Sequence, residues 1–494
     1  MAAMDHDVER VYELSPMQHA MLVASVVAPG SGVYLVQVTL RLSNRLDPAA
    51  FEQAWRCVIA RHAILRTGFF WEDQDKPVQV VYREVALPLR RESWRGLGAA
   101  AQTERLRALL DADREQGFDL DEPPLLRLAL IELEGGEWQV VWTMHHIVAD
   151  GWSRSLLLDE LFEAYAALAA GREPELASSR SYEDYIVWLQ RWDPAAAEAF
   201  WRRHLAGFAS PTLLAARNGH GAIAANFRDM RRRSGRLEAA ATAALRQLTR
   251  RHHVTLATLV HGAWALVVAR ESDSDEVVFG STVAGRPLEL AGAESMIGLF
   301  INTLPVRVGV DPASRLLPWL TALQERLSET RLYEHAPLAE IHGWSGLAAG
   351  APLFDNILVI ENQPQNAALA ERLPEVSVSE VRSSEQTGYP LHVMIVPGPE
   401  LQLDLIHDLH RVGAAAAARL EERLAAALRA FAVTPEARLA AVSLLLPGER
   451  QSLLREHNDT AAVLPAQRCV HELLAAQAAS TPRAVAVRGG GQAL

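Results

Sequence analysis

The sequence predicts a mixed α/β (α+β) fold built as two similar lobes. Strand-like and helix-like stretches alternate in the first half of the 494-residue chain, and the second half repeats that order. Hydrophobic residues make up 49% and charged residues 22%, the composition of a globular protein with enough apolar side chains for large cores. At roughly 100–200 residues per domain, the length corresponds to two to four compact units.

The first half contains two strands and two helices with clear periodicity. Near-alternation of apolar and polar residues over 33–42 predicts a half-buried strand. Residues 47–62 predict an amphipathic helix, with Asp47 as its N-cap. A second strand is expected over 137–146, followed by a helix over 152–168 whose leucines recur at helical spacing.

The second half repeats this pattern after a crossover at 171–181, a stretch with a proline and three serines. Helices are expected over 254–270, 318–332 and 413–431, and strands over 276–283, 354–360, 392–396 and 401–406. The sequence Pro-Gly-Pro-Glu at 397–400 predicts the turn between the last two strands. These patterns divide the chain into a first lobe, 1–175, and a second lobe, 176–447.

The character of the sequence changes near residue 446. Residues 448–469 are polar and rich in turn-forming residues, which indicates a linker. Residues 470–494 begin another helix and strand and then stop, so we expect them to be the truncated start of a further domain.

Charge and cysteine content exclude several classes of protein. The net charge of −12 argues against nucleic acid as the main partner. The basic run at 228–236 is either a solvated loop or a docking patch for an acidic partner. Cys57 and Cys469 are too few for a disulfide framework or a metal cluster. With no signal-peptide pattern and no apolar run long enough to span a membrane, a cytoplasmic protein is expected.

The segment Met-His-His-Ile-Val-Ala-Asp-Gly at 144–151 is the strongest candidate for chemistry. Neighbouring strand residues point to opposite faces, so His146 is expected on the face of Met144 and His145 on the other. One histidine can then face a reaction site while the other is held in the structure. Asp150 and Gly151 form a turn into the following helix, where a carboxylate binds backbone amides or a cation.

A neutral imidazole at this position suits proton transfer near neutral pH. The plain alternative is a histidine pair that is merely packed or exposed at a strand end. A two-histidine metal site is disfavoured because the neighbours diverge and no further ligands cluster nearby, so no metal is expected. A serine–histidine–aspartate triad lacks a GxSxG nucleophile turn. The position of the pattern between a strand and a helix favours a proton-handling site.

Further motifs recur in order along almost the whole chain. They are LSPMQ at 14–18 with AML at 20–22, RHAILRT at 61–67, MHHIVADGWS at 144–153, YEDYIVW at 182–188, IGLFINT at 297–303, FDN at 354–356 and EN at 361–362. This series resembles the condensation domains of nonribosomal peptide synthetases, within the chloramphenicol-acetyltransferase-like acyltransferases. The segment at 470–487 resembles the start of an adenylation domain, the usual downstream neighbour.

The resemblance implies two acetyltransferase-like lobes forming a V-shaped pseudo-dimer with a central tunnel. Donor and acceptor carrier proteins would dock at opposite mouths, each inserting a phosphopantetheine arm that bears a thioester. The acceptor α-amine would attack the donor thioester and form an amide, as in the biosynthesis of antibiotics and other secondary metabolites. The domain would bind no cofactor of its own and act as a monomer beside its adenylation domain.

The resemblance also assigns roles to residues. The catalytic segment would comprise His145, His146, Asp150 and Gly151, with His146 catalytic, His145 structural and Gly151 letting the backbone approach the reacting groups. Asp150 would form a structural ion pair with Arg286. The candidates for the substrate tunnel are Trp152, Ser153, Asn302 and Asn362, and the two asparagines have an alternative role as amides that fix strands or loops. Since a free α-amine has a pKa of about 7.7–8.0, His146 either orients the amine or relays its proton.

Related enzymes fit less well. Heterocyclisation domains carry paired aspartates in place of the two histidines, epimerisation domains are not followed by an adenylation start, and wax-ester or triacylglycerol acyltransferases lack the YEDYIVW segment. A dual epimerising and condensing domain and a catalytically silent docking module stay open. The opening motif and HHIVADGWS favour an L-configured donor and acceptor.

Overall fold

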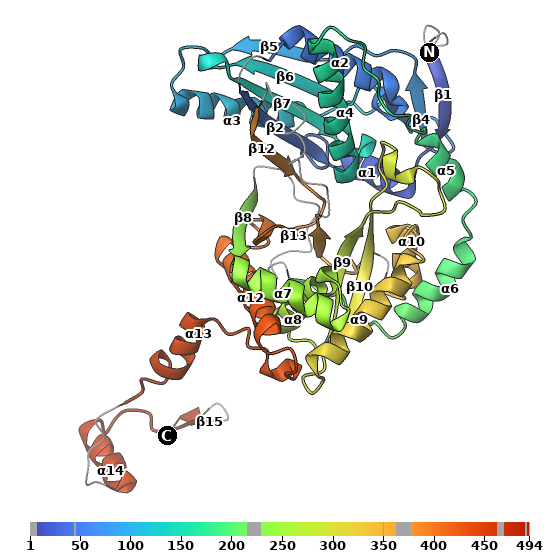
Figure 1. Ribbon diagram of the computed structural model, residues 1–494. Helices are drawn as coiled ribbons and strands as arrows, with labels where there is room; N and C mark the ends of the chain where they lie inside the picture. Colours follow the sequence, from blue (N-terminus) through green and yellow to red (C-terminus); the bar gives the residue numbers. More distant parts are fainter. Residues whose placement is uncertain are drawn as a thin grey trace. The chain divides into compact units, whose positions relative to one another are not determined.

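The computed structural model describes residues 7–43, 46–214, 229–348, 350–361, 377–461, 469–489 and 492–493. The chain divides into two compact units, Met1–Leu444 and Leu445–Leu494. The described part of the first unit contains two large mixed sheets, one in each lobe, and a small antiparallel sheet (Figure 1).

The sheet of the first lobe has the strand order β12-β2-β7-β6-β5. Its strands are β2 (Leu35–Ser43), β5 (Leu89–Ser93), β6 (Leu126–Glu132), β7 (Trp138–His145) and β12 (Ser377–Glu385). Helices α2 (Pro48–Arg61) and α4 (Gly151–Ala169) bury one face of this sheet, where Trp55 and Trp142 meet in a core. Helix α3 (Ala99–Gln116) packs on the other face against Ile131 and Val141. Strand β7 is therefore buried on both sides.

The N-terminal segment forms the small sheet, in the order β1-β4-β3. Its strands are β1 (Val8–Glu13), β3 (Thr67–Phe70) and β4 (Val78–Tyr82). Helix α1 (Pro16–Val27) begins with a capping box, in which Ser15 and Gln18 each bind the other's backbone N–H. The LSPMQ motif is thus a helix start. The Gln18 amide also donates to the Ile147 carbonyl, which ties α1 to the histidine segment.

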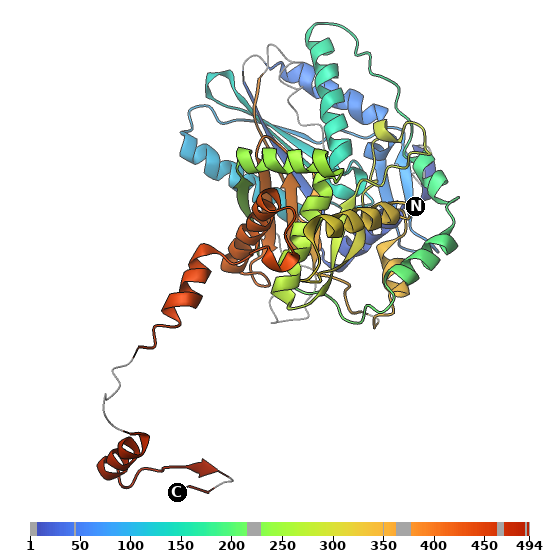
Figure 2. The ribbon, with the colours of Figure 1, turned by 60° about the horizontal axis from the view of Figure 1, so that its bottom comes forward.

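The sheet of the second lobe has the order β10-β9-β11-β13-β14-β8. Its strands are β8 (Met230–Leu237), β9 (Glu276–Val283), β10 (Asn302–Gly309), β11 (Asn356–Ile360), β13 (Leu391–Val396) and β14 (Leu401–Asp408). The helices of this lobe are α5 (Glu183–Leu189), α6 (Pro194–His204), α7 (Ala239–His252), α8 (Leu256–Ser272), α9 (Leu316–Arg331), α10 (Leu338–Trp344) and α12 (Ala414–Val433). Figure 2 shows α7, α8, α9 and α12 gathered on one side of this sheet, where their apolar side chains form a second core.

The elements expected from the sequence are found within a few residues of their predicted ends. The predicted N-cap is confirmed, since Asp47 Oδ1 accepts from Ala49 N at 2.8 Å and Ala50 N at 3.2 Å. Residues 172–181 have no regular secondary structure, as expected of a crossover. The turn at 397–400 joins β13 to β14 in an antiparallel pair.

The expectation of a loop for the basic run is wrong. Residues 230–237 form β8, which pairs with β14 at the sheet edge and buries Met230 and Leu237. The strand forms because its arginines find carboxylates close by: Arg232 binds Asp404 at 2.5 Å and Arg233 binds Glu421 at 3.2 Å. Arg228 lies outside the described residues.

Strand β12 crosses between the lobes. It belongs by sequence to the second lobe, yet it pairs with β2 in the sheet of the first (Figure 1). The expected boundary at 175/176 stays a prediction. The structure adds that 377–385 pack with the first lobe, because β2 offers an unpaired edge to this strand.

The second unit is small. Helix α13 (Pro447–Gln451) and a single π-helical turn (Ser452–Glu456) lie in the predicted linker, of which 462–468 are outside the described residues. Helix α14 (Val470–Ser480) and the short strands β15 (Arg488–Gly489) and β16 (Gln492–Ala493) follow. In the described residues, no single helix is long and apolar enough to cross a membrane; only α7 and α8 taken together, with a bend of 112°, meet the length and composition required.

Candidate active site

The histidine segment lies where β7 ends and α4 begins. Every residue from Gln139 to His145 is buried, because helices cover both faces of the sheet. His146 starts a 3-10 turn, His146–Val148, so strand alternation ends at His145 and the turn sets the direction of His146. Asp150 then caps α4.

His145 is held by two hydrogen bonds. Its Nδ1 accepts from the Ile147 backbone N–H at 3.2 Å, so the neutral ring carries its proton on Nε2, 3.1 Å from Ser25 Oγ. The side chain is 4% exposed. Burial, together with the neighbouring His146, lowers the pKa of His145 to about 3. His145 is therefore a neutral residue that ties the turn to α1, and its purely structural role stays a prediction.

His146 lies in the wall of a cavity of about 1460 Å³ that is bounded by both lobes. Its backbone N–H donates to Tyr34 O at 2.7 Å, and its side chain is buried. Nε2 lies 3.9 Å from Glu385 Oε2, too far for a hydrogen bond. Burial lowers the pKa of His146, and the Glu385 carboxylate partly offsets this while Arg154 adds to it. A neutral imidazole near a carboxylate can accept a proton.

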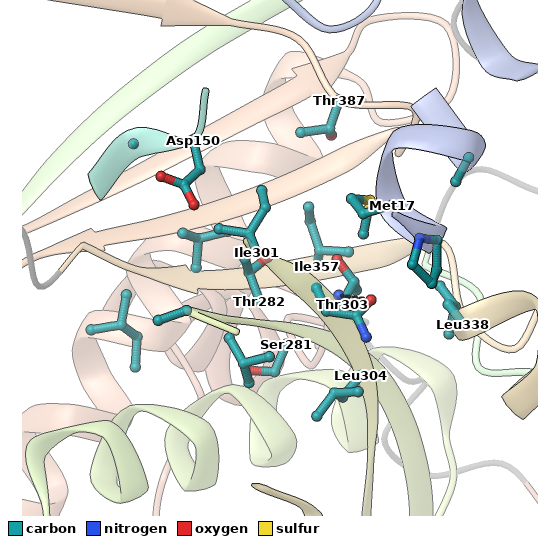
Figure 3. Close-up of a pocket in the computed structure, with 18 of the residues that line it drawn as sticks. Met17, Asp150, Ser281, Thr282, Ile301, Thr303, Leu304, Leu338, Ile357 and Thr387 are labelled. Carbon is teal, nitrogen blue, oxygen red and sulfur yellow. Dashed lines mark hydrogen bonds between the residues drawn. The ribbon is translucent and has the colours of Figure 1, made fainter. Parts of the chain in front are cut away.

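The cavity wall comes from both lobes, as Figure 3 shows. The labelled residues are Met17 of α1, Asp150, Ser281 and Thr282 of β9, Ile301 just before β10, Thr303 and Leu304 of β10, Leu338 of α10, Ile357 of β11, and Thr387. The lining combines apolar side chains with many polar and charged ones, a make-up that suits an organic substrate with polar groups.

Asp150 joins the lobes although it is completely buried. Its Oδ1 accepts from the Ser153 N–H at 2.8 Å and lies 3.4 Å from Arg286 Nη2, and its Oδ2 accepts from the Phe300 N–H at 3.0 Å. Arg286 also donates to Met296 O at 2.9 Å and stacks 4.1 Å from the centre of the Phe300 ring. Burial lowers the pKa of Arg286, and Asp150 opposes that effect. The predicted partners therefore meet in a shared network that fixes the loop at 298–300.

Ser153 belongs to this network and not to the cavity lining. Its hydroxyl donates to Gly298 O at 2.8 Å and lies 2.9 Å from Arg286 Nη2, and the side chain is fully buried. The expectation of Ser153 as a tunnel residue is corrected because the first turn of α4 directs this side chain toward the loop. Gly298 is required here, since a Cβ would come within 2.0 Å of the Tyr182 ring.

The other expected tunnel residues differ in their surroundings. Gly151 and Trp152 line the cavity, and the Trp152 indole donates to Glu294 O at 2.9 Å. Asn302 also lines it, but its amide donates to Glu334 O and Ala336 O, both at 2.8 Å, and its oxygen accepts from Thr303 N. These bonds match the strand-fixing alternative for Asn302. Asn362 lies outside the described residues.

Sequence reasoning missed three polar residues beside His146. Glu385 binds Arg154 at 3.0 Å, and both line the cavity. His392 of β13 also lines it, is 1% exposed, and has no hydrogen-bond partner on either ring nitrogen in the described part of the chain. No motif spacing indicates these residues, because strand pairing across the lobes brings them together. No strand was expected over 377–385, so nothing in the sequence singled out Glu385.

Comparison with known proteins identifies the family. A family model described as "Condensation domain" matches residues 8–454. The chain belongs to the condensation-domain family. It is also 40% identical over 483 residues to one of the proteins that make up the linear gramicidin synthase of Brevibacillus parabrevis, a match that covers 98% of this chain but only 6% of that protein. The domain is therefore an acyltransferase-type, amide-bond-forming unit of a nonribosomal peptide synthetase, of the kind found in antibiotic synthetases.

Solved structures agree on the fold. The first condensation domain of the calcium-dependent antibiotic synthetase, in complex with a substrate analogue, superposes with a TM-score of 0.74 at 23% identity, over 88% of this chain and 100% of that one. The X-domain in complex with OxyB from teicoplanin biosynthesis gives 0.73 at 26% identity, over 89% and 97%. The mixed α/β, acetyltransferase-like fold expected from the sequence is confirmed. Condensation domains work with carrier and adenylation domains and use phosphopantetheine-bound substrates.

Proposed function

We propose that this domain joins a donor aminoacyl or peptidyl thioester to the α-amine of an acceptor aminoacyl thioester, with His146 as the catalytic residue. The observation that carries the proposal is the position of this imidazole, whose side chain is 10% exposed, in the wall of a cavity bounded by both lobes. Both substrates arrive on phosphopantetheine arms, and the domain binds no cofactor of its own. The cavity serves as the central part of a tunnel in a V-shaped pseudo-dimer.

The acceptor nitrogen forms a bond to the thioester carbon, and the carbon–sulfur bond breaks. The nitrogen loses one proton, and the departing thiolate gains one. His146 takes this proton as the tetrahedral intermediate forms and passes it to the thiolate. Since an α-amine with a pKa of about 7.7–8.0 is partly neutral near pH 7, orientation of the amine is a second contribution of the same side chain.

The surrounding residues support the reaction from fixed positions. The Asp150–Arg286 pair, at 3.4 Å, holds the start of α4 and the facing loop. Gly151 and Trp152 form the adjoining wall, where a residue without a side chain leaves the backbone open to substrate. In this proposal, His146 is the residue that exchanges a proton with the reacting groups.

The partners belong to the same proposal. An upstream donor carrier and a downstream acceptor carrier dock at opposite mouths, and residues 470–494 begin an adjoining adenylation domain. The domain acts as a monomer in the cytoplasm. The placement of a similar segment within a much longer gramicidin synthase supports such neighbours, since this chain spans 6% of that protein. An L-configured donor and acceptor are proposed, with a dual epimerising and condensing domain as the alternative.

A second candidate is a silent module that recruits another enzyme. It is favoured by the similarity to an X-domain solved in complex with OxyB, at 26% identity. The intact His146–Asp150 segment weighs against it, because a module that only docks has no use for an imidazole in a cavity wall.

The test is a condensation assay with two loaded carriers, using donor thioesters of both configurations and intact-protein mass spectrometry. We expect a dipeptidyl thioester on the acceptor carrier, formed from the L-donor. His146→Ala should lower the rate by about 10²–10⁴-fold, the usual effect of removing a positioned base. His457→Ala, at an exposed position in the second unit, is the matched histidine control and should keep the wild-type rate.

Thermal unfolding of each variant separates lost chemistry from lost structure. Near-wild-type product from folded His146→Ala would remove His146 from the mechanism. Absence of product from the wild type, together with binding of OxyB, would favour the silent module.

A further inference from the structure

Glu385 is a half-buried carboxylate beside His146 that no motif of the sequence indicates. It is the last residue of β12, where the chain leaves the sheet of the first lobe and continues to β13 in the second (Figure 1). Its side chain is 16% exposed and lines the same cavity as His146. Such a carboxylate is costly to bury unless it has partners.

Strand register delivers Glu385 to its place. Glu385 pairs with Val36 of β2, and Val36 pairs with Met144 of β7, two residues before His146. Three neighbouring strands thus align the carboxylate with the end of β7. The pairing joins the lobes, so the position of Glu385 relative to His146 depends on β12 lying in the first sheet.

One carboxylate oxygen serves two partners. Glu385 Oε2 accepts from Arg154 Nη1 at 3.0 Å and lies 3.9 Å from His146 Nε2. Arg154 follows Asp150 by four residues, so both face the same side of the first turns of α4. The ion pair with Arg154 holds the Glu385 carboxylate 3.9 Å from His146 Nε2. At this distance the carboxylate attracts a protonated imidazole but forms no hydrogen bond with Nε2.

We propose that Glu385 is a positioning residue for His146: held by Arg154, it orients the imidazole and stabilises the imidazolium that forms when His146 takes the proton of the acceptor amine. The proposal rests on the proposed function of His146. The proton moves from the amine to Nε2 and then to the departing thiolate, while Glu385 stays ionised throughout. Arg154 and Glu385 therefore shift the pKa of His146 in opposite directions: Arg154 lowers it and Glu385 raises it.

The charges around His146 are consistent with this role. The charges are Glu385 on β12, Arg154 on α4 and Asp150 at the N-cap, and the neighbouring titratable groups are His145 on β7 and His392 on β13. Burial opposes the charge of Glu385, but Arg154, His146 and His392 together lower the pKa of its carboxyl to about 2. Burial lowers the pKa of His392, so this neighbour is neutral at pH 7.

The first measurement is a pH titration of His146 by NMR in protein labelled with ¹³C-histidine, with the resonance assigned by its loss in His146→Ala. Glu385→Gln removes a charge that raises the pKa of His146, so the pKa should fall further below that of the wild type. Arg154→Gln removes a charge that lowers it, so the pKa should rise. A merely structural role would not produce shifts of opposite sign.

Glu361→Gln is the matched control. Glu361 lines the same cavity, and burial together with Glu385 raises the pKa of its carboxyl to about 7, but it is not among the charges that act on His146. This variant should leave the His146 titration unchanged. In the loaded-carrier assay, Glu385→Gln should lose about 10²-fold in rate, the scale of a misplaced catalytic group, and Glu385→Asp should recover part of it.

The outcomes separate this inference from the proposed function. An unchanged His146 titration in Glu385→Gln, or a wild-type condensation rate while His146→Ala is inactive, would overturn the role of Glu385 alone. Full activity of His146→Ala would overturn the proposed function instead. Glu385→Gln could unfold because it leaves the Arg154 charge without its partner. The double variant Arg154→Gln/Glu385→Gln removes both charges and avoids this cost. The double variant should still show the lower condensation rate expected of Glu385→Gln.

Discussion

At the scale of the residue, two neighbouring histidines have different tasks because their surroundings differ. Both ring nitrogens of His145 lie within hydrogen-bond distance of a partner, whereas the Nε2 atom of His146 is 3.9 Å from its nearest carboxylate. Strand alternation predicted that the two side chains diverge. It did not predict that a 3-10 turn would set the direction of His146.

His261 allows the same principle to be tested away from the proposed chemistry. Its Nδ1 donates to Ala257 O at 2.7 Å and its Nε2 accepts from Ser281 Oγ at 2.8 Å, which suits the neutral ring. Burial lowers the pKa of His261 from 6.5 to about 4, and the bond to Ala257 partly opposes this. The unfolded chain therefore binds a proton between pH 6.5 and 4 that the folded chain does not.

We predict that this group's contribution to stability is complete above pH 6.5 and is lost as the pH falls toward 4. In His261→Gln, the free energy of unfolding should depend less steeply on pH in this window, by about 1.4 kcal/mol per pH unit. Urea unfolding of both proteins at several pH values measures the difference. Parallel curves would mean that His261 titrates alike in the folded and unfolded chain.

At the scale of the element, the N-terminus of α4 connects the lobes. The Asp150 carboxylate caps the helix through Ser153, accepts from Phe300 of the facing loop and pairs with Arg286. The side chain of an ordinary N-cap accepts hydrogen bonds only from backbone N–H groups of its own helix, as the Asp47 side chain does for α2. The two aspartates therefore have the same local geometry and different tertiary roles.

We predict that Asp150→Ala destabilises the domain by about 3–5 kcal/mol, because it leaves the Arg286 guanidinium buried without its partner. Asp47→Ala is the matched control and should cost only about 1 kcal/mol, the loss of a cap. Urea unfolding measures both. Equal effects of the two substitutions would show that the Asp150–Arg286 pair adds nothing beyond capping.

At the scale of the whole molecule, the first unit contains both lobes and the shared cavity. None of the buried core clusters in the described residues includes a side chain beyond Val442. The second unit, Leu445–Leu494, forms a separate compact unit but has almost no buried side chains among those described.

We therefore predict that a chain ending at Leu444 folds with the Tm of the full chain, because removal of the second unit takes no side chain from a core. Calorimetry of the two proteins tests this. A clearly lower Tm for the shorter chain would mean that residues after Leu444 stabilise the lobes.

The sequence alone determined the elements with clear periodicity, such as β2, α2, β7 and α4, and singled out the segment at 144–151, since periodicity, caps and turn residues act over a few positions. Strand alternation separated the two histidines, and the resemblance to condensation domains favoured His146 over His145. Tertiary structure decided what depends on long-range contacts. The basic run forms β8 because it pairs with β14 and its arginines bind Asp404 of β14 and Glu421 of α12. Ser153 turns to the loop at 298–300. Tertiary structure also decided the place of Glu385, because register across β12, β2 and β7 joins residues more than 200 positions apart in the chain.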